Sequence, residues 1–415
     1  MDVLTSIPPL PGQWLNRSDL ADIAPLYVQR LASLGYACHT QRVYLYCAAH
    51  FAHWKSQCRI KIHDLAPAHI ARFLDAHLPS CRCPQPARRC RHECRAALRH
   101  LLATLRDAGI PAAPREIDAI EDELNRFGRH MEHARGLAIN TRNQRLHILR
   151  ALLMFGRNST RTAVPLIEAD QLRGFIAQQL SRWSPASAQV LATTLRGYLR
   201  FRACSGDDVR HLLPVIATPA NWRLAPLPET LSDTELDTVL SAFPEQLPSM
   251  RRAYAMVRCL VDLGLRAREV VQLRLDDIDW RSGTIRLDHN KSRRVDVLPL
   301  PRETGEAIAR YLEFERPRTT SRCVFVRHVA PVDAPVGPGI VRRAMREAYG
   351  RCGSTHTRVH VLRHTLARRV LASGGTLKEV ADLLRHRSLD TSQIYAKVDT
   401  SSLSQVAMPW PGSTS

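Results

Sequence analysis

The sequence lacks the features of membrane insertion and of secretion. Its 415 residues contain no run of about 18 apolar residues, so a transmembrane helix is not expected. The amino-terminal stretch MDVLTSIPPLPGQW has neither the basic start nor the apolar segment of a secretory signal. Glycine and proline, at 19 and 26 residues, are too few for a fibrous repeat or a long disordered region. We therefore expect a cytoplasmic, globular protein with two to three domains.

Lysine is scarce, yet the chain is strongly basic. Against 39 Asp and Glu, the 59 Lys and Arg leave a net charge of +20. A charge of this sign favours a polyanionic partner, either nucleic acid or an anionic membrane surface. Because arginine is so common here, a lysine at a meaningful position carries more information than an arginine does. The five lysines are Lys55, Lys61, Lys291, Lys378 and Lys397.

The eleven cysteines are an odd number in a long chain without a signal peptide, which indicates reduced thiols rather than a disulfide framework. Four of them, with His92 among them, are close in sequence: Cys81, Cys83, Cys90 and Cys94. Such a set is compatible with a structural zinc ion, although its spacing is not one of the tight CxxC signatures. Buried or unused thiols are the alternative.

The first half of the chain shows weak internal repetition. ALRHLLATLRDAG (Ala97–Gly109) aligns with TLRGYLRFRACSG (Thr194–Gly206) at an offset of 97 residues. Upstream, Leu65–Leu74 resembles Ile167–Ile176 at an offset of 102 residues. Two copies of a small helical bundle are the natural interpretation. Chance similarity among arginine-rich amphipathic helices is the alternative.

The pattern changes after the proline-containing linker LAPLPET (Leu224–Thr230). Two capping boxes, Ser232-x-x-Glu235 and Thr376-x-x-Glu379, each predict the start of a helix. Further helices are predicted at Met250–Asp262, Arg268–Leu275, Glu303–Glu315 and Gly339–Tyr349.

Two alternating runs, TIRLD at 284–288 and RVDVLPL at 294–300, predict a β-hairpin joined by HNKSR. The run CVFV at 323–326 predicts one more short strand. The second half is therefore expected to be a helical domain that contains one small sheet.

Four motifs follow one another after residue 260. They are LGLRAREVVQL (Leu263–Leu273), HNKSRRVDVLPL (His289–Leu300), HVLRHTLA (His360–Ala367) and LLRHRSLDTSQIYAKV (Leu383–Val398). Within the last motif, His386 and Tyr395 are nine residues apart. In their order and spacing the four motifs closely resemble the tyrosine recombinase, or phage integrase, family, over about residues 230–400. The family pattern is a G-L-R-x-x-E turn, a hairpin lysine, H-x-L-R-H, an L-L-G-H-like turn, and a tyrosine nine residues after the last histidine.

The resemblance implies a mainly α fold, with helical amino-terminal DNA-binding (core-binding) bundles followed by a mixed, mostly helical catalytic domain with a small β-sheet. We expect an extension at 1–20, a first core-binding-like domain at 21–125, a second at 126–225, and the catalytic domain with its C-terminal tail at 226–415. One departure is Arg385, where the family commonly has glycine. We expect it to change the helix end there but to touch no reacting group.

Two arginines have the chemistry to hold a scissile phosphate. In-line attack on a phosphodiester builds charge on its non-bridging oxygens, and the planar guanidinium groups of Arg266 and Arg363 can hold them bidentately while staying charged. Glu269, three residues after Arg266 on the same helical face, is placed to orient that guanidinium. For either arginine alone, a solvated surface charge is the ordinary interpretation.

The resemblance assigns the remaining roles. Tyr395 is the nucleophile, which needs a proton acceptor or nearby cations because the pKa of a phenol is about 10. His360 is its acid/base and His386 donates a hydrogen bond to the phosphate. Lys291, at the hairpin tip, protonates the leaving 5′-oxygen, which arginine cannot do because it does not release protons. The predicted catalytic set is Arg266, Lys291, His360, Arg363, His386 and Tyr395.

This chemistry needs no cofactor and no metal ion. Nothing in the sequence resembles GxxxxGK[ST], and no carboxylate cluster suggests a two-metal nuclease. We expect a site-specific recombinase or integrase that acts through a 3′-phosphotyrosyl intermediate in DNA integration or transposition. We expect its partner to be double-stranded DNA and expect no membrane partner. A type IB topoisomerase-like enzyme that relaxes DNA, and a DNA-binding accessory protein that does not cut, are the alternatives.

Exchange of strands between two duplexes implies an assembly. We expect a homo-oligomer, a dimer on one site and a tetramer on synapsed sites, or sister recombinases as partners. The family couples subunits by passing a C-terminal segment to a neighbour, and SSLSQVAMPWPG (Ser401–Gly412) offers apolar side chains for this contact. Packing of this tail on its own domain is the alternative.

Overall fold

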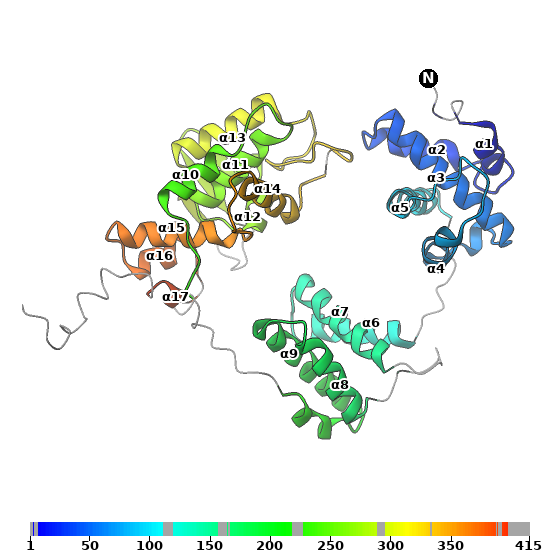
Figure 1. Ribbon diagram of the computed structural model, residues 1–415, viewed down its shortest axis with the longest axis horizontal. Helices are drawn as coiled ribbons and strands as arrows, with labels where there is room; N and C mark the ends of the chain where they lie inside the picture. The colour runs from blue at the N-terminus through cyan, green and yellow to red at the C-terminus, as the bar shows by residue number, and fades with distance from the viewer. Residues whose placement is uncertain are drawn as a thin grey trace, which may run out of the picture. The chain divides into compact units, whose positions relative to one another are not determined.

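The computed structural model describes residue 3 and residues 7–110, 119–156, 164, 167–217, 227–288, 295–332, 334–386, 388 and 392–396. The chain forms two compact units, residues 114–225 and residues 1–113 together with 226–415. The fold is mainly α with a small β-sheet, as predicted (Figure 1). Within the described ranges, no helix has both the length and the apolar character needed to cross a bilayer.

The first helical bundle has a core of its own. α3 packs against α1, α2 and α5, and the side chains of Tyr27, Phe51 and Phe73 are almost fully buried. Leu15 and Leu20, within the predicted extension at 1–20, belong to the same core. The elements are α1 (Pro9–Asn16), α2 (Ala24–Ser33), α3 (Cys38–Gln57), η1 (Ile62–Asp64), α4 (Pro67–Arg72), η2 (Phe73–His77), η3 (Leu78–Ser80) and α5 (Arg91–Asp107).

The second helical bundle has a separate core, in which α7 packs against α6, α8 and α9. Ile120 and Leu124 of α6 belong to this core. The predicted boundary between residues 125 and 126 lies within α6, and the compact unit begins at residue 114. The elements are α6 (Ala119–His133), α7 (Ile139–Phe155), α8 (Ala169–Leu180), α9 (Pro185–Cys204) and η4 (Arg210–Val215).

The last long helices of the two bundles, α5 and α9, end in the same way. Each is followed by a glycine with positive φ, Gly109 at +72° and Gly206 at +100°. The hydrogen bond that closes each helix also recurs at the offset of 97 residues. Such a bond accompanies a left-handed residue at a helix end. They run from Ile110 N to Leu105 O (3.0 Å) and from Asp207 N to Arg202 O (3.1 Å). Because α2, α14 and α16 end with the same hydrogen bond after a residue of positive φ, this geometry does not distinguish duplication from chance similarity.

The C-terminal domain is built around α11, which packs against α12, α13, α14 and α15. Both predicted capping boxes are present: Glu235 N donates to Ser232 Oγ and Glu379 N donates to Thr376 Oγ1, each at 3.2 Å. The helical elements are α10 (Asp233–Ser241), α11 (Met250–Asp262), α12 (Ala267–Gln272), η5 (Leu275–Asp277), α13 (Arg302–Phe314), α14 (Pro338–Arg351), α15 (His360–Ala372), α16 (Leu377–Leu383) and α17 (Gln393–Ala396).

The sheet of this domain has three antiparallel strands in the order β1 (Ile278–Asp279), β2 (Thr284–Leu287) and β3 (Asp296–Pro299). The predicted hairpin is confirmed at its described ends, where Leu287 pairs with Asp296. The predicted strand at 323–326 is wrong. Although its valines and phenylalanine are fully buried, this segment makes only single bridges, because the partners of Cys323 and Val326, Arg274 and Pro335, belong to no strand.

Candidate active site

The G-L-R turn joins α11 to α12 and fixes the position from which the Arg266 side chain projects. Gly264 has a φ of +56°, and a Cβ there would lie 2.7 Å from Leu384 and 2.9 Å from Leu366, so only glycine fits. Arg266 is the residue immediately before α12, and its backbone N–H donates to Glu269 Oε2 at 2.8 Å. Glu269 thus caps the helix that follows the turn.

Glu269 is a buried carboxylate shared by two arginines. Its Oε1 accepts from Arg266 Nη1 at 2.6 Å, and its Oε2 accepts from Arg385 Nη2 at 2.9 Å. Burial by itself raises the pKa of Glu269, but Arg385 and Arg266 more than offset this, so the pKa is lowered and the carboxylate is ionised. The prediction that Glu269 orients the Arg266 guanidinium is confirmed.

Arg385 adopts the backbone conformation that glycine has in the family pattern. Its φ is +54°, and His386 N donates to Ala381 O at 2.9 Å, so α16 ends as a glycine-capped helix does. The expectation of a different helix end is therefore wrong. A left-handed residue with a side chain costs about 1–2 kcal/mol. The ion pair with Glu269 and the hydrogen bond to Leu383 O, at 3.2 Å, offset that cost.

Arg363, on α15, is 6% exposed and is held by backbone carbonyls. Its Nη1 donates to Gly264 O and its Nη2 donates to Leu384 O, which ties α15 to both motif turns. Burial, together with the charges of Arg266 and Arg385, lowers its pKa to about 9, which leaves the group cationic at pH 7.

The three arginines carry more charge than their surroundings neutralise. Glu269 forms ion pairs with Arg266 and Arg385, and the charge of Asp296 also acts on Arg385, so two carboxylates face three guanidinium groups. Close cations that repel one another are stabilised by an anion placed between them. A phosphate group has the charge and the several oxygen acceptors that guanidinium groups bind.

Tyr395 lies next to these arginines on α17 and is 2% exposed. It packs with Ala367, Leu371 and Leu384, and its hydroxyl lies 2.9 Å from His364 Nδ1. Burial raises the pKa of Tyr395, while the nearby cations Arg363 and Arg266 act in the opposite direction. The phenol is thus protonated at pH 7 and needs a proton acceptor to react.

Two further histidines complete the site. His386 Nδ1 lies 2.7 Å from Ser392 Oγ, and its ring is parallel to that of Tyr395 with centroids 6.3 Å apart. Burial and the charge of Arg363 lower the pKa of His386 to about 4. His360 is the first residue of α15, and partial desolvation and the same arginine lower its pKa as well. Both rings are therefore neutral at pH 7, and each has one N–H to donate.

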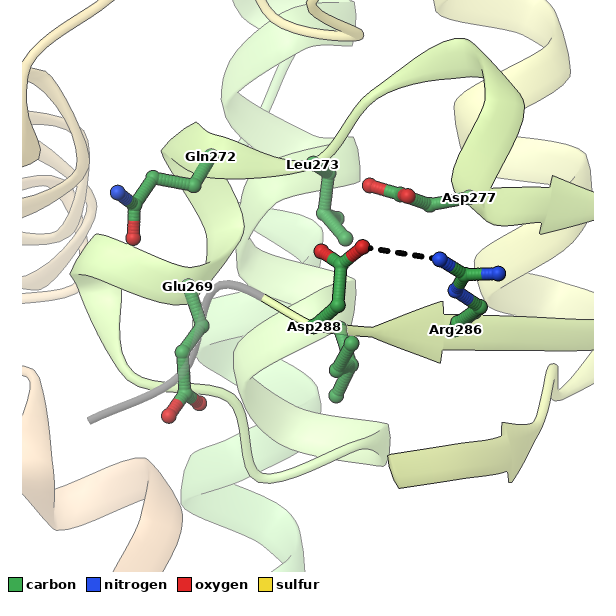
Figure 2. A pocket seen from close by; sticks show the side chains of 7 residues that line it. Glu269, Gln272, Leu273, Asp277, Arg286 and Asp288 are labelled. Carbon is green, nitrogen blue, oxygen red and sulfur yellow. Dashed lines mark hydrogen bonds and ion pairs between the residues drawn. The ribbon is translucent and has the colours of Figure 1, made fainter. Parts of the chain in front are cut away.

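A small pocket between α12 and β2 lies beside this site. Figure 2 shows Arg286 on β2 paired with Asp288, at 3.1 Å, and Glu269 and Gln272 projecting from α12. Asp277 also lines the pocket. Carboxylates dominate its lining and would repel phosphate, so its contribution is structural: it lies where the hairpin leaves the sheet.

Residues 229–402 match the model of the phage integrase family. Over 392 residues, the chain is 34% identical to the protein y4rA of Sinorhizobium fredii, which is named as an integrase/recombinase, and the match covers 93% of each chain. The chain belongs to the phage integrase family. This recombinase is also 27% identical over 285 residues to the tyrosine recombinase XerD of Lacticaseibacillus casei, a match covering 67% of the chain and 94% of that relative.

A solved structure shares the fold of this recombinase. The crystal structure of the XerH site-specific recombinase bound to palindromic difH substrate, a post-cleavage complex, has a TM-score of 0.54 at 17% identity. The similarity covers 82% of this chain and 95% of that one. The protein is thus a tyrosine recombinase by family and by fold.

The structure of the recombinase brings five of the six predicted site residues within hydrogen-bonding or electrostatic range of one another: Arg266, His360, Arg363, His386 and Tyr395. The sixth, Lys291, lies outside the described residues, between the paired strand ends Leu287 and Asp296.

Sequence reasoning missed His364, the hydrogen-bond partner of the Tyr395 hydroxyl. A signal was available, because His364 follows His360 by four residues within HVLRH, and residues four apart share one helical face. That face points toward the tyrosine.

Proposed function

We propose that this recombinase cleaves and rejoins double-stranded DNA through a 3′-phosphotyrosyl intermediate, in DNA integration or transposition within the cytoplasm. The observation that carries the proposal is the arginine cluster at Tyr395: Arg266 and Arg385 share the Glu269 carboxylate, and the charges of Arg363 and Arg266 act on the Tyr395 hydroxyl. The name of y4rA, an integrase/recombinase that matches nearly the whole chain, supports recombination. The XerH structure, a complex with its DNA substrate, supports DNA as the partner.

In the proposed cleavage step, Arg266 and Arg363 bind the non-bridging oxygens of the scissile phosphate, and His386 donates its free N–H to the same group. Tyr395 Oη attacks phosphorus in line, forming the Oη–P bond as the bond to the 5′-oxygen breaks. The phenolic proton passes to a neutral imidazole. His364 is its hydrogen-bond partner, and His360 is the acid/base of the family pattern.

The leaving 5′-oxygen takes a proton, which we assign to Lys291 on the hairpin. A 5′-hydroxyl from another strand then attacks the phosphotyrosyl phosphorus, returns the proton to the enzyme and releases Tyr395. The two steps exchange one phosphodiester for another, so no cofactor and no outside energy source is needed.

Strand exchange between two duplexes requires four such sites. We propose that the protein dimerises on one DNA site and forms a tetramer on synapsed sites, alone or with a sister recombinase. The two helical bundles and the catalytic domain, at 226–415, would contact the DNA together. The segment Ser401–Gly412, proposed to couple subunits, lies outside the described residues.

The test is capture of a covalent adduct on nicked DNA taken from the flanks of the gene. Wild-type protein should form a protein–DNA adduct, whereas Tyr395→Phe should form none and bind the same DNA equally well, because it keeps every phosphate-binding charge. An adduct with the Tyr395→Phe protein would overturn the assignment. Two differently labelled duplexes then separate recombination from relaxation, since only a recombinase joins one label to the other.

Lys291 is tested by changing the leaving group. Lys291→Ala should slow cleavage of ordinary DNA much more than cleavage of DNA with a 5′-bridging phosphorothiolate, because sulfur leaves without being protonated. Equal slowing on both substrates would show that Lys291 binds phosphate instead.

A further inference from the structure

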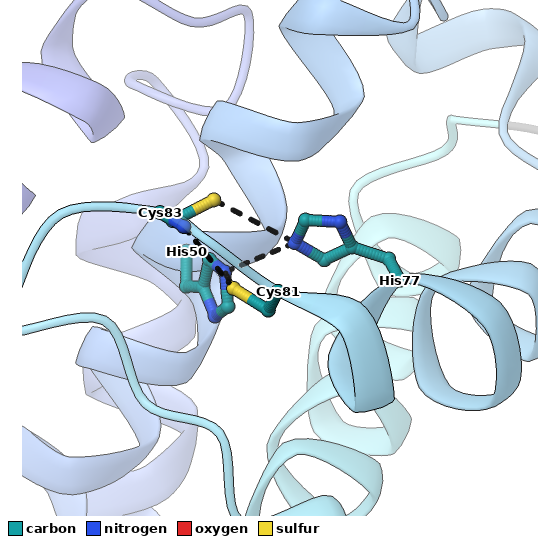
Figure 3. A group of neighbouring side chains, drawn as sticks. All are labelled: His50, His77, Cys81 and Cys83. Carbon is teal, nitrogen blue, oxygen red and sulfur yellow. Dashed lines mark hydrogen bonds between the residues drawn. The ribbon is translucent and has the colours of Figure 1, made fainter.

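A second group of reactive side chains lies in the first helical bundle, outside the active site. His50 belongs to α3, His77 ends η2, and Cys81 and Cys83 follow η3. The ligand atoms of these four residues all lie within 4.8 Å of one another. Figure 3 shows the two rings and the two thiols converging on one point.

The spacing of these atoms is that of ligands around one metal ion. With Zn–N bonds of about 2.0–2.1 Å and Zn–S bonds of about 2.3 Å, neighbouring atoms in a zinc tetrahedron lie about 3.3–3.8 Å apart. His50 Nε2 lies 3.3 Å from His77 Nε2 and 3.3 Å from Cys81 Sγ. Cys83 Sγ lies 3.6 Å from His77 Nε2. All three distances fall on the edges of such a tetrahedron.

The hydrogen bond on the far side of His50 sets its tautomer. Nδ1 lies 2.7 Å from Arg88 O, and a carbonyl oxygen only accepts, so Nδ1 carries the proton. In the neutral ring, Nε2 then presents a lone pair to His77 and Cys81. Metal-binding histidines have this arrangement, with the second ring nitrogen fixed by a carbonyl or carboxylate.

The chemistry of the donors selects the ion. Two thiolates and two imidazoles in a tetrahedron favour Zn²⁺, and the two negative charges neutralise it. Four protein ligands leave no position for substrate, which is the mark of a structural site. His50 is fully buried, Cys83 is 8% exposed, and His77 and Cys81 are partly buried, so the group lies at the edge of the bundle interior.

The ligands differ from the set of cysteines that the sequence favoured. Cys90 is exposed. Cys94 is buried in the core, where its Sγ donates to Arg88 O at 3.5 Å. A site made of Cys81, Cys83, Cys90 and Cys94 is therefore not the one that the fold assembles. Two histidines distant in sequence take the places of the last two cysteines.

We propose that His50, His77, Cys81 and Cys83 bind one structural zinc ion, which fastens the segment from Cys81 to Cys90 onto α3. This segment has no helix or strand of its own and carries Arg82, Arg88 and Arg89. The ion would hold these basic side chains in place. The inference stands independently of the proposed reaction.

The first experiment is metal analysis of the full chain purified without a histidine tag. Wild-type protein should contain about one zinc ion per chain. Cys81→Ser and Cys83→Ser should lose it, and the matched control Cys90→Ser should keep it. Chelation by 1,10-phenanthroline should lower the first melting transition of wild-type protein by about 5 °C or more, and leave the metal-free variants unchanged.

A second readout needs no variant to fold. Cobalt(II) loaded in place of zinc should give the visible spectrum of a tetrahedral site with thiolate ligands. Alkylation mapped by mass spectrometry should spare Cys81 and Cys83 in native protein, modify Cys90, and modify all three after chelation.

Three results would overturn the proposal. One is less than about 0.2 equivalents of zinc together with free reaction of Cys81 and Cys83 in native protein. Another is loss of zinc from Cys90→Ser while Cys81→Ser retains it. The third is a disulfide between Cys81 and Cys83 in zinc-free protein. Adduct formation by Tyr395 is measured separately, so failure here leaves the proposed reaction intact.

Discussion

Two buried carboxylates in this molecule each form ion pairs with two arginines, one carboxylate in the second helical bundle and one in the active site. In the bundle, Glu123 accepts hydrogen bonds from Tyr198 and Arg126, each at 2.9 Å. Arg202 lies 3.7 Å from Glu123 and also pairs with Asp207. Two cations thus meet two anions around a tyrosine hydroxyl.

In the active site, by contrast, Glu269 pairs with both Arg266 and Arg385, Asp296 also attracts Arg385, and Arg363 is held by carbonyl oxygens. A balanced network stabilises the fold as it stands. A network with surplus positive charge lowers the stability of the fold, and a bound anion neutralises that surplus. The difference separates a structural use of arginine from a ligand-binding one, although both networks contain a buried tyrosine.

Removing each carboxylate is the strongest test of this comparison. Glu269→Gln should lower the local unfolding free energy of α12 by about 3–5 kcal/mol, because Arg266 and Arg385 lose their shared anion. Glu123→Gln should lower the local unfolding free energy of α9 by only about 1–3 kcal/mol, because Arg202 still pairs with Asp207. Amide hydrogen exchange measures the two regions in the same protein.

Sulfate supplies the control for this pair. It should restore protection in α12 of Glu269→Gln and leave α9 of Glu123→Gln unchanged, because only the active site binds an anion that stabilises the folded state. Equal losses without a sulfate response would refute the distinction between the two networks.

Removing one arginine from each network should have opposite effects. Arg266→Gln should lower the rate of adduct formation by about 100-fold or more, through loss of transition-state charge stabilisation, while the Tm of DNA-free protein stays the same or rises. Arg202→Gln should lower the Tm and leave the rate of adduct formation unchanged. A parallel loss of both properties in both variants would contradict the comparison.

The active-site network should also respond to pH. The pKa of His386 is about 4 in the folded protein and about 6.5 when unfolded, so the unfolded chain binds more protons between these values. The free energy of unfolding should therefore fall as pH drops from about 6.5 to 4, with no contribution above that window. Thermal melts across this range should show a shallower decline for His386→Asn. If the His386→Asn variant shows the same decline as the wild type, a group other than His386 is responsible for it.

The smallest expected effect concerns Arg385. Arg385→Gly and Arg385→Ala both remove the ion pair with Glu269, but only alanine keeps a Cβ in the left-handed conformation. The glycine variant should be more stable than the alanine variant by about 1 kcal/mol, measured by denaturant unfolding. Equal stabilities would mean that the backbone there relaxes.

Local signals in the sequence predicted local structure well. Neighbouring residues determine the capping boxes at Ser232 and Thr376 and the hairpin whose first strand ends at Leu287. The structure contains each of these features. The pairing of Arg266 with Glu269 was equally accessible, because three residues on a helix bring the two side chains together.

What the sequence did not reveal depends on contacts between distant segments. The cost of the left-handed conformation of Arg385 is offset by its ion pair with Glu269, 116 residues away. His364 approaches Tyr395 only once α15 and α17 are packed together. His50 approaches Cys81 through the fold of the first bundle, so spacing between cysteines pointed to other ligands.

Residues 114–225 form one continuous unit whose core contains no residue from outside it. A stretch of this kind can be copied, exchanged or removed as a block without repacking the core around α11. In evolutionary terms, the segment of the gene that encodes residues 114–225 can change hands separately from the segments that encode the active site.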